Sequence, residues 1–511
     1  MGQQKSKLDA GKKKKNRLTA DQKKALRWGI ALVALFTILI VLGFAVSNDW
    51  FEGFGPACKV GDVEISKEEY NFNFYSNYSS FLNYYSGNIS AIGLDTSKPL
   101  SSQQYSEDKT WQDFFDEQTY KNLADAVAMS EAAKKAGVSL NEDNQKQVDN
   151  YIESIKSGAK ANNVSFGSYT RQVYGRKMNE EQVRSAMSRV LLADQYAAEL
   201  HDSYEIGDDA IEKEYTDNKD TYDKVTYRVI TVEADIPSGG DMESDEYEKA
   251  VSEAMTAAKT KADELMKEIA GSGRVTETHF AKVAMEYAKE TADDEEKAAE
   301  ITEDDSRKIA AGIKSVTDEE GAKWLFDPAR KDLDTSIIEE ADAYSIYLFV
   351  ERTRDDYAAV NVRHILVPFN DDIKDAKDDA EDAAAKAKAE GYMNEFKAAG
   401  ATEEAFAELA KKYGKDATTD KGGLMEDVVK GQMVETFNDW IFDPARKPGD
   451  YDFVRTEYGW HLVYFSGTSR LAYKITVEEA IRQRTYNEEY DGIMANYPVT
   501  VNGIEVYRYS R

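Results

Sequence analysis

Cysteine and histidine are the scarcest reactive residues in this 511-residue chain, which contains one cysteine, Cys58, and four histidines. A single cysteine excludes an internal disulfide framework and any metal site built from several cysteines. Four scattered histidines also argue against a zinc or iron centre, so we expect no metal and no cofactor. The chain is too long for one ordinary domain and predicts three or four.

Positive charge is scarce beyond the first 27 residues. That segment holds ten Lys/Arg against two Asp, whereas the whole chain has a formal net charge of −30. Proteins that bind nucleic acid need a positive surface to neutralise phosphates. The acidity therefore predicts no nucleic-acid partner and is typical of a large, soluble surface. Hydrophobic residues make up 41% of the chain, which is enough to build cores.

Long apolar runs are rare too, and the exception is Trp28–Val46, nineteen residues without a charge. A helix of this length can cross a bilayer. Because the basic tail, residues 1–27, precedes it, we predict a single-pass cell-membrane anchor with a cytoplasmic N-terminus and a large extracytoplasmic region. A cleaved signal peptide is the alternative, although its apolar region would be shorter and would end in an A-x-A-like site.

Residues 59–223 are predicted to form a mostly helical domain after a short strand at Lys59–Ile65. Ser66 is placed to cap the next helix, with Glu69 at the capping-box spacing. That helix, near residues 70–85, is crowded with Tyr and Phe. Aromatics at helical spacing are typical of a core, but they would also suit a surface that binds unfolded chains. Further helices are expected at Trp111–Gly137, Glu142–Ala161, Phe166–Tyr174, Asn179–Tyr204 and Asp208–Tyr222.

An internal repeat follows this region. The octapeptide Trp324–Lys331 recurs as Trp440–Lys447 with seven identities. Two further pairs of segments match in the same order, upstream of each octapeptide. Residues 225–352 and 360–467 are therefore predicted to be one fold used twice.

Each copy begins and ends with strand signals and has helices between them, which predicts a small antiparallel sheet packed on helices. The last region, residues 470–511, is predicted to form a helix at Val477–Ala495 and then a strand or hairpin, whose natural partner is the strand that contains Val60. The fold class is thus α+β: a transmembrane helix, a helical N-terminal domain and two tandem sheet domains. In the second copy we expect helices at residues 371–399, 402–413 and 434–442 and a hairpin at residues 450–465.

The second copy has no motif of a serine hydrolase, a zinc hydrolase or a P-loop. It does contain six ordered pieces that together resemble a parvulin-type peptidyl-prolyl cis/trans isomerase. The anchor, helical region and tandem domains resemble the foldase-chaperones of the SurA and PrsA kind. The six pieces are R-H-I-L-V (Arg363–Val367), F-A-x-L-A-x-x-Y (Phe406–Tyr413), Asp416, G-G-L (Gly422–Leu424), G-Q-M-V-x-x-F (Gly431–Phe437) and T-x-Y-G-W-H-L-V (Thr456–Val463).

This resemblance implies a role for each matching residue. His364 and His461 would form a buried, hydrogen-bonded pair that Thr456 supports, and Asp416 would face the imide of the substrate. An apolar slot for the proline ring would be lined by Leu424, Met433 and Phe437. The pattern departs from the family at Gly422–Met425, which puts the local turn geometry in doubt. The histidines could instead serve only the fold, and Met433 and Phe437 could be ordinary core.

The first copy lacks the matching histidines, since Val229 and Ser345 stand in their places. We therefore expect it to be inactive. The chain is predicted to be an extracytoplasmic isomerase and chaperone whose partners are unfolded or partly folded secreted polypeptides with X–Pro bonds. The alternative is a non-catalytic holdase or binding scaffold in which both copies are inactive. The sequence does not predict an oligomeric state.

Overall fold

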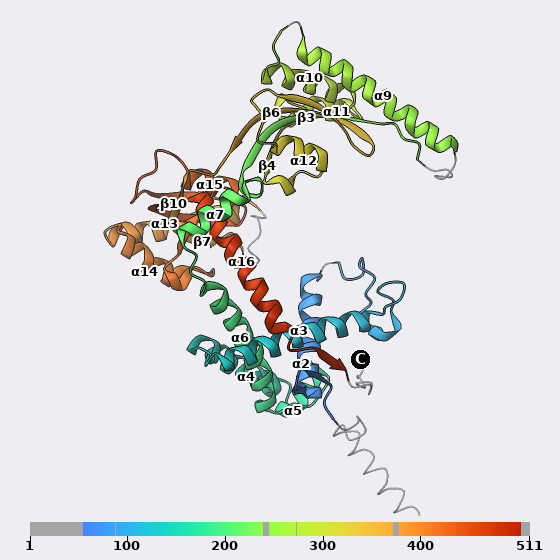
Figure 1. Cartoon of the computed structure of the whole chain (residues 1–511). Coiled ribbons are helices and arrows are strands. Elements are labelled where there is room, and N and C mark those ends of the chain that lie inside the picture. Colours follow the sequence, from blue (N-terminus) through green and yellow to red (C-terminus); the bar gives the residue numbers. More distant parts are fainter. Residues whose placement is uncertain (1–54, 87, 239–244, 272, 371–377, 502–511) are drawn as a thin grey trace, which may run out of the picture. The chain divides into compact units, whose positions relative to one another are not determined.

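The computed structural model describes residues 55–86, 88–238, 245–271, 273–370 and 378–501 (Figure 1). These residues fall into two compact units, one within residues 1–204 and 485–511 and the other within residues 205–484. Both units combine helices with sheets, which confirms the predicted α+β class. No helix of the described residues is long and apolar enough to cross a membrane. The predicted anchor, Trp28–Val46, lies outside them.

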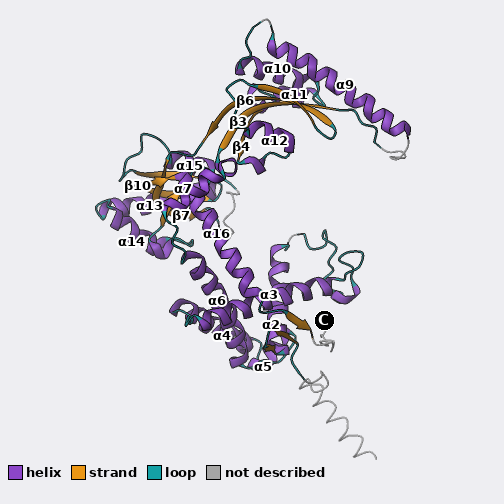
Figure 2. Ribbon diagram, in the orientation of Figure 1, coloured by secondary structure: helices purple, strands orange, loops and turns teal. Residues whose placement is uncertain are grey.

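The first unit is mostly helical (Figure 2). Short polar side chains cap its helices: Asn141 and Ser165 each accept a hydrogen bond from a backbone N–H in the first turn of the helix that follows. The predicted helix starts at Glu142 and Phe166 are confirmed for this reason. The helices are α2 (Lys67–Tyr84), α3 (Trp111–Lys135), α4 (Glu142–Ala161), α5 (Phe166–Tyr174), α6 (Glu180–Asp202) and the short 3-10 helix η1 (Leu100–Ser102).

A small three-stranded sheet completes this unit. The single strand predicted at Lys59–Ile65 is wrong: it is a hairpin of β1 (Cys58–Val60) and β2 (Val63–Ile65). Gly61 turns the chain between the two strands with a φ of +56°, a conformation that favours glycine. The predicted partnership with the C-terminal region is confirmed, because β11 (Val499–Val501) pairs antiparallel with β1.

The aromatic helix α2 belongs mainly to the core. Ser66 caps it by accepting from the backbone N–H of Glu69, as predicted, and the Glu69 carboxylate pairs with Arg189 at 2.7 Å. Tyr70 is fully buried, as are most residues of the first two turns, whereas Tyr84 at the C-terminal end is 82% exposed. Core packing therefore accounts for the first half of the aromatic run and leaves only its last turn as surface.

The second unit contains two four-stranded antiparallel sheets with the same strand order, β4-β3-β6-β5 and β8-β7-β10-β9. We call Lys224–Thr353 the first sheet domain and Ala358–Leu471 the second sheet domain. The strands are β3 (Lys224–Glu233), β4 (Arg307–Ala311), β5 (Thr335–Glu339), β6 (Ala343–Thr353), β7 (Ala358–Pro368), β8 (Leu424–Val428), β9 (Tyr451–Arg455) and β10 (Gly459–Leu471).

The helices of this unit complete both domains (Figure 1). Helix α16 begins at Ala472, five residues before its predicted start at Val477. The predicted helices after Thr402 and near Val434 are confirmed within one residue. The helices are α7 (Asp208–Asp217), α8 (Lys219–Tyr222), α9 (Asp245–Ala270), α10 (Glu277–Glu290), α11 (Glu295–Glu300), α12 (Glu319–Phe326), α13 (Asp379–Ala398), α14 (Glu403–Tyr413), α15 (Glu435–Ile441) and α16 (Ala472–Met494), with 3-10 helices η2 (Glu303–Ser306), η3 (Ile313–Ser315) and η4 (Thr419–Lys421). The residues of α16 from Thr485 on belong to the first unit.

An ion pair between the first long strand and a helix start recurs in the two sheet domains. Arg228 of β3 pairs with Glu277 of α10, and Arg363 of β7 pairs with Glu403 of α14, both at 2.9 Å. Each arginine lies just before the position that carries Val229 or a histidine. The same residues thus tie strand to helix in both domains.

Helices cover both faces of each sheet. In the second sheet domain, α13 and α14 pack on one face through Ile365, Phe396 and Phe406. The short helix α15 packs on the other face through Phe437 and Ile441, against Val362 and neighbouring strand residues. The first sheet domain repeats this layering, with α9 and α10 on one face and α12 on the other. The face covered by α15 is the one that carries the histidines.

Candidate active site

The two histidines of the second sheet domain meet across its central strands. His364 of β7 lies opposite Val463 of β10, and His461 lies opposite Leu366, so the histidines are diagonal neighbours on one face. Their Nδ1 atoms are 3.2 Å apart, and their rings are nearly parallel at 5.5 Å between centroids. The structure thus brings together the pair that the resemblance implied.

Hydroxyl and carboxylate groups hold both ends of this pair. Thr456 Oγ1 lies 3.0 Å from His461 Nε2, and the backbone N–H of Tyr458 donates to the same hydroxyl at 3.1 Å. At the other end, Asp416 Oδ2 lies 3.5 Å from His364 Nε2. Thr418 fixes that carboxylate, donating to Asp416 Oδ1 from its backbone N–H at 2.8 Å and from its hydroxyl at 2.6 Å.

These contacts define one consistent set of protons. The Thr418 hydroxyl donates a hydrogen bond to Asp416. His364 Nε2 therefore faces two acceptors, the Thr418 hydroxyl oxygen and the Asp416 carboxylate, and must itself carry a proton. A neutral His364 then accepts at Nδ1 from His461 Nδ1–H, which leaves His461 Nε2 to accept from the Thr456 hydroxyl. The hydrogen bonds therefore run in one direction, from Thr456 through His461 to His364, and the remaining His364 Nε2–H lies 3.5 Å from the Asp416 carboxylate without a hydrogen bond to it.

Burial keeps both imidazoles neutral. It lowers the pKa of His461 from 6.5 to about 3, with a smaller lowering from the neighbouring His364. Burial also lowers the pKa of His364, against an opposing effect of Asp416. A neutral pair cannot act as a strong general acid near pH 7, so the arrangement is better suited to holding a rigid, dry surface than to moving protons.

An apolar wall faces the imidazoles. Phe437 is only 2% exposed, and its ring meets both imidazoles edge to face, at 5.9 Å from His364 and 5.3 Å from His461. Met433, which precedes α15 in the chain, packs into the same cluster as Phe437, as does Met425 of β8. The structure thus brings Phe437 against the histidine pair, and it places Met433 in the apolar cluster around Phe437.

Leu424 does not share this face of the sheet, which corrects its predicted place in the slot. It lies opposite Arg363, whose side chain reaches Glu403 on the α14 side. Residues opposite each other in an antiparallel pair point to the same face, and adjacent residues point to opposite faces. Met425, opposite Val362, therefore takes the position that the sequence assigned to Leu424.

The glycine turn before β8 is positioned by close contact with β7. Gly422 and Gly423 have φ values of +67° and +73°. A Cβ at Gly423 would collide with the backbone carbonyl of His364, whose own N–H donates to the Gly423 carbonyl at 2.9 Å. The two glycines thus let β8 run directly beside the histidine strand. This is the geometry at the point where the sequence departs from the family pattern.

Two family models match the chain. Residues 344–468 match the PPIC-type PPIASE domain, and residues 21–197 match the SurA-like N-terminal domain. The chain therefore contains a parvulin-type peptidyl-prolyl isomerase domain and a SurA-like N-terminal domain. No curated protein matches it.

Solved PrsA structures are similar to this isomerase at low identity. The peptidylprolyl isomerase PrsA from Bacillus anthracis shares 16% identity with a TM-score of 0.17, covering 60% of this chain and 94% of that one. PrsA from Bacillus subtilis shares 17% with a TM-score of 0.18, covering 63% and 89%. The foldase PrsA from Streptococcus pneumoniae shares 16% with a TM-score of 0.18, covering 49% and 77%.

Sequence reasoning missed two residues of the isomerase site, Thr418 and Met425. Thr418 follows Asp416 by two positions, the spacing at which an aspartate commonly accepts from a nearby backbone N–H and hydroxyl. That local signal was available. Met425 was missed because the resemblance implied its neighbour, Leu424, for the slot, and adjacent strand residues point to opposite faces.

The described residues of the first sheet domain do not repeat this arrangement. Val229 lies opposite Tyr347, as His364 lies opposite Val463, which makes Ser345 the counterpart of His461. By the offset of the repeated octapeptide, Gly321 is the counterpart of Phe437. A Cβ at Gly321 would lie 2.6 Å from the Tyr347 hydroxyl. The tyrosine ring therefore occupies the space that the phenylalanine fills in the second domain.

Proposed function

We propose that this isomerase is a membrane-anchored, extracytoplasmic folding factor that catalyses cis/trans isomerisation of X–Pro bonds in unfolded or partly folded secreted polypeptides. The observation that carries the proposal is the ring of Phe437, set edge to face against a buried, neutral histidine pair, with Met425 and Met433 in the same apolar cluster as Phe437.

The chemistry needs no bond to break. The barrier of about 18–20 kcal/mol exists because the amide loses resonance when it twists, and the uncatalysed reaction takes tens to hundreds of seconds. The twisted imide is less dipolar than the planar one, so a dry, apolar site favours it relative to water. A catalyst that grips the proline ring and excludes water therefore lowers the barrier.

The residues of the second sheet domain are assigned roles on this basis. Phe437, Met433 and Met425 form the proline slot, and the histidine pair forms its rigid floor. Thr456 and Asp416 hold the two ends of the pair. Because Asp416 Oδ2 is buried and turned toward His364, we assign the carboxylate to polarising that imidazole beside the imide.

The first sheet domain is proposed to be inactive and to serve binding or spacing. Tyr347 packs against Tyr227 and Trp324 in tilted ring contacts, at 5.8 and 6.2 Å between ring centroids. This cluster fills the position of the slot with side chains. Without the histidines and without an open slot, the domain has no means of gripping a proline ring.

The main alternative is a holdase with two inactive copies. We would measure isomerisation of a short X–Pro peptide and suppression of client aggregation with the full chain in lipid nanodiscs. Phe437→Ala should reduce turnover of the peptide while leaving client holding intact. The matched control, Met266→Ala in the first sheet domain, should leave both unchanged. Absence of peptide turnover by the parent chain, with holding intact, would establish the alternative.

The membrane anchor is a separate part of the proposal. It rests on the uncharged run Trp28–Val46 behind a basic tail. The chain should remain in the membrane pellet after alkaline carbonate extraction, and a variant lacking residues 28–46 should not. A secreted product that begins after residue 46 would show instead that the run is a cleaved signal peptide.

A further inference from the structure

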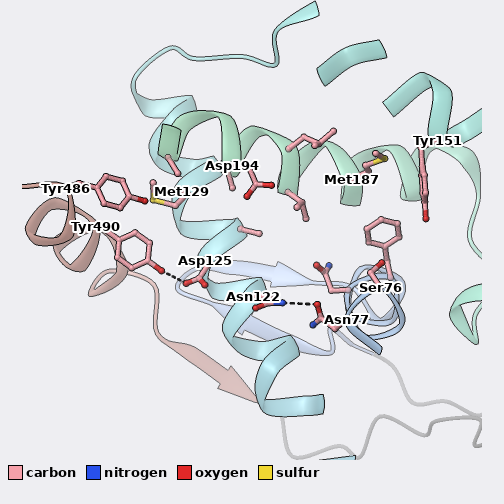
Figure 3. Close-up of a pocket in the computed structure, with 17 residues that line it drawn as sticks. Ser76, Asn77, Asn122, Asp125, Met129, Tyr151, Met187, Asp194, Tyr486 and Tyr490 are labelled. Atoms are coloured by element: carbon pink, nitrogen blue, oxygen red, sulfur yellow. Dashed lines mark hydrogen bonds between the residues drawn. The ribbon is translucent and has the colours of Figure 1, made fainter. Parts of the chain in front are cut away.

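The first unit contains a cavity of about 550 Å³ between α2, α3, α4, α6 and the end of α16 (Figure 3). This volume lies in the range of ligand sites, about 300–1,000 Å³. All seventeen residues that line it belong to the first unit. The aromatic helix α2 contributes mainly polar residues to it, among them Asn77, which accepts from Asn122 at 2.8 Å.

Soft apolar side chains form part of the wall, including Met129 and Met187. Methionine is unbranched and polarisable, so it adapts to ligands of different shape. Three tyrosines, Tyr151, Tyr486 and Tyr490, add aromatic rings. Rings with polar tips suit ligands that carry both an apolar body and a charge.

Two carboxylates face this cavity, and they differ in their partners. Asp125 accepts from the Tyr490 hydroxyl at 2.6 Å. Asp194 points from α6 into the space between α6 and α3 (Figure 3). Burial by the surrounding wall raises the pKa of Asp194. Among the described residues that line the cavity there is no lysine, arginine or histidine to balance either carboxylate.

We propose that this cavity binds a lysine or arginine side chain of an unfolded polypeptide, flanked by apolar residues, with Asp194 as the partner of its charge. The proposal rests on the proposed function, in which the chain binds unfolded polypeptides. It adds that this binding selects segments with a basic side chain between apolar residues. The side-chain stem lies against the methionines, and the charged head reaches the carboxylates. Asp194 is exposed to solvent and no basic residue among the described lining balances its charge, so an incoming cation can pair with it.

A bare metal ion is a poorer occupant. Hard cations take six or more oxygen ligands, and the cavity offers two carboxylates. No group of three His, Cys, Asp or Glu side chains that could hold a metal occurs in the part of the chain that the structure describes. An apolar wall does not help to bind an ion, whereas it can pack against the hydrocarbon stem of a basic side chain.

The test uses short capped peptides without proline, so that the isomerase site cannot bind them as substrates. Their centre is Leu-Lys-Leu, Leu-Gln-Leu or Leu-Glu-Leu, with glycine and serine on both sides and a fluorophore at one end. Binding to the full chain in zwitterionic nanodiscs is measured by fluorescence anisotropy, and empty nanodiscs provide the background. We expect the lysine peptide to bind about five-fold more tightly than the glutamine peptide at low salt.

Variants assign the preference to one carboxylate. Asp194→Asn preserves shape and should abolish the difference between lysine and glutamine, and Asp194→Lys should make the glutamate peptide the better ligand. Glu181→Gln removes the same charge from an exposed site on the same helix, outside the cavity lining, and should keep the parent's preference. Thermal unfolding of each variant shows whether it is folded.

Two results would overturn the inference: equal affinity of the parent for the lysine and glutamine peptides, or a lysine preference that survives in folded Asp194→Asn. X–Pro turnover of the parent is measured in the same preparation. If turnover is absent while the lysine preference depends on Asp194, the proposed catalysis fails and the inference stands. If turnover is present without the preference, only the inference fails.

Discussion

Thr456 and Asp416 lie at opposite ends of the histidine pair. Thr456 fixes the orientation of His461, and Asp416 faces His364 Nε2. Thr456 is 3% exposed and donates to His461 Nε2. A buried acceptor that loses its donor costs about 1–3 kcal/mol. The histidine pair therefore depends on a hydroxyl that the substrate does not need to touch.

Replacing Thr456 tests this dependence. Thr456→Val keeps the shape and removes the hydroxyl, so we expect about 1–3 kcal/mol less stability against urea and a lower kcat/KM for an X–Pro peptide. Thr456→Ser retains the donor and should recover most of both. A valine variant with the stability and turnover of the parent would contradict the assigned role.

The depressed histidine pKa values predict how stability depends on pH. Because burial lowers the pKa of His461 from 6.5 to about 3 in the folded state, the unfolded chain binds the proton first as the pH falls. The contribution is complete above about pH 6.5 and is lost progressively as the pH falls toward 3. Urea unfolding between pH 7.5 and 4.5 should show a steeper loss for the parent than for His461→Gln. Parallel curves would mean that His461 is not buried and neutral.

The sequence analysis named the histidine pair, Asp416 and Phe437 because the family motifs that contain them occur in the same order in this chain. Physical patterning alone would have left them as strand and core residues. Thr418 had a local signal in its spacing from Asp416. Asp194 had none, because nothing in the sequence shows that an exposed helix residue borders a cavity built from five helices.

Strands and helices were predictable where local chemistry defines their ends. Caps such as Asn141 and Thr402 placed helix starts within a residue. The hairpin at β1 and β2 was not predicted, because a tight turn interrupts the alternation on which strand patterns depend. The place of Leu424 was taken from the resemblance and not from a strand pattern. These errors are local and leave the strand order intact.

Gly423 tests whether β8 must run this close to β7. Gly423→Ala would place a Cβ against the His364 carbonyl in a left-handed conformation. Gly400→Ala is the control, because Gly400 also has a positive φ, +100°, but has no neighbour within 4 Å of such a Cβ. We expect Gly423→Ala to lower the unfolding midpoint and the turnover of an X–Pro peptide more than the control does. Equal effects would show that only the φ matters.

The chain contains the same sheet architecture twice, but only the second sheet domain has the histidine pair with Phe437 packed against it. The ion pairs Arg228–Glu277 and Arg363–Glu403 maintain both copies. Two matching positions differ between the copies in opposite senses. The first copy has the small residue Gly321 beside the large Tyr347, and the second has the large Phe437 beside the small Val463. This reciprocity explains how the first domain can lose the slot without losing its core.

The most direct measurement is made on a variant whose second sheet domain carries the glycine and tyrosine of the first, Gly321 and Tyr347, at the matching positions. The double variant Phe437→Gly, Val463→Tyr should place a tyrosine ring where the slot lies, and kcat/KM for an X–Pro peptide should fall about 100-fold or more relative to the parent chain. Circular dichroism and thermal unfolding establish that the variant is folded. A folded double variant with the parent's kcat/KM would contradict the account, because catalysis would then lie outside this pocket.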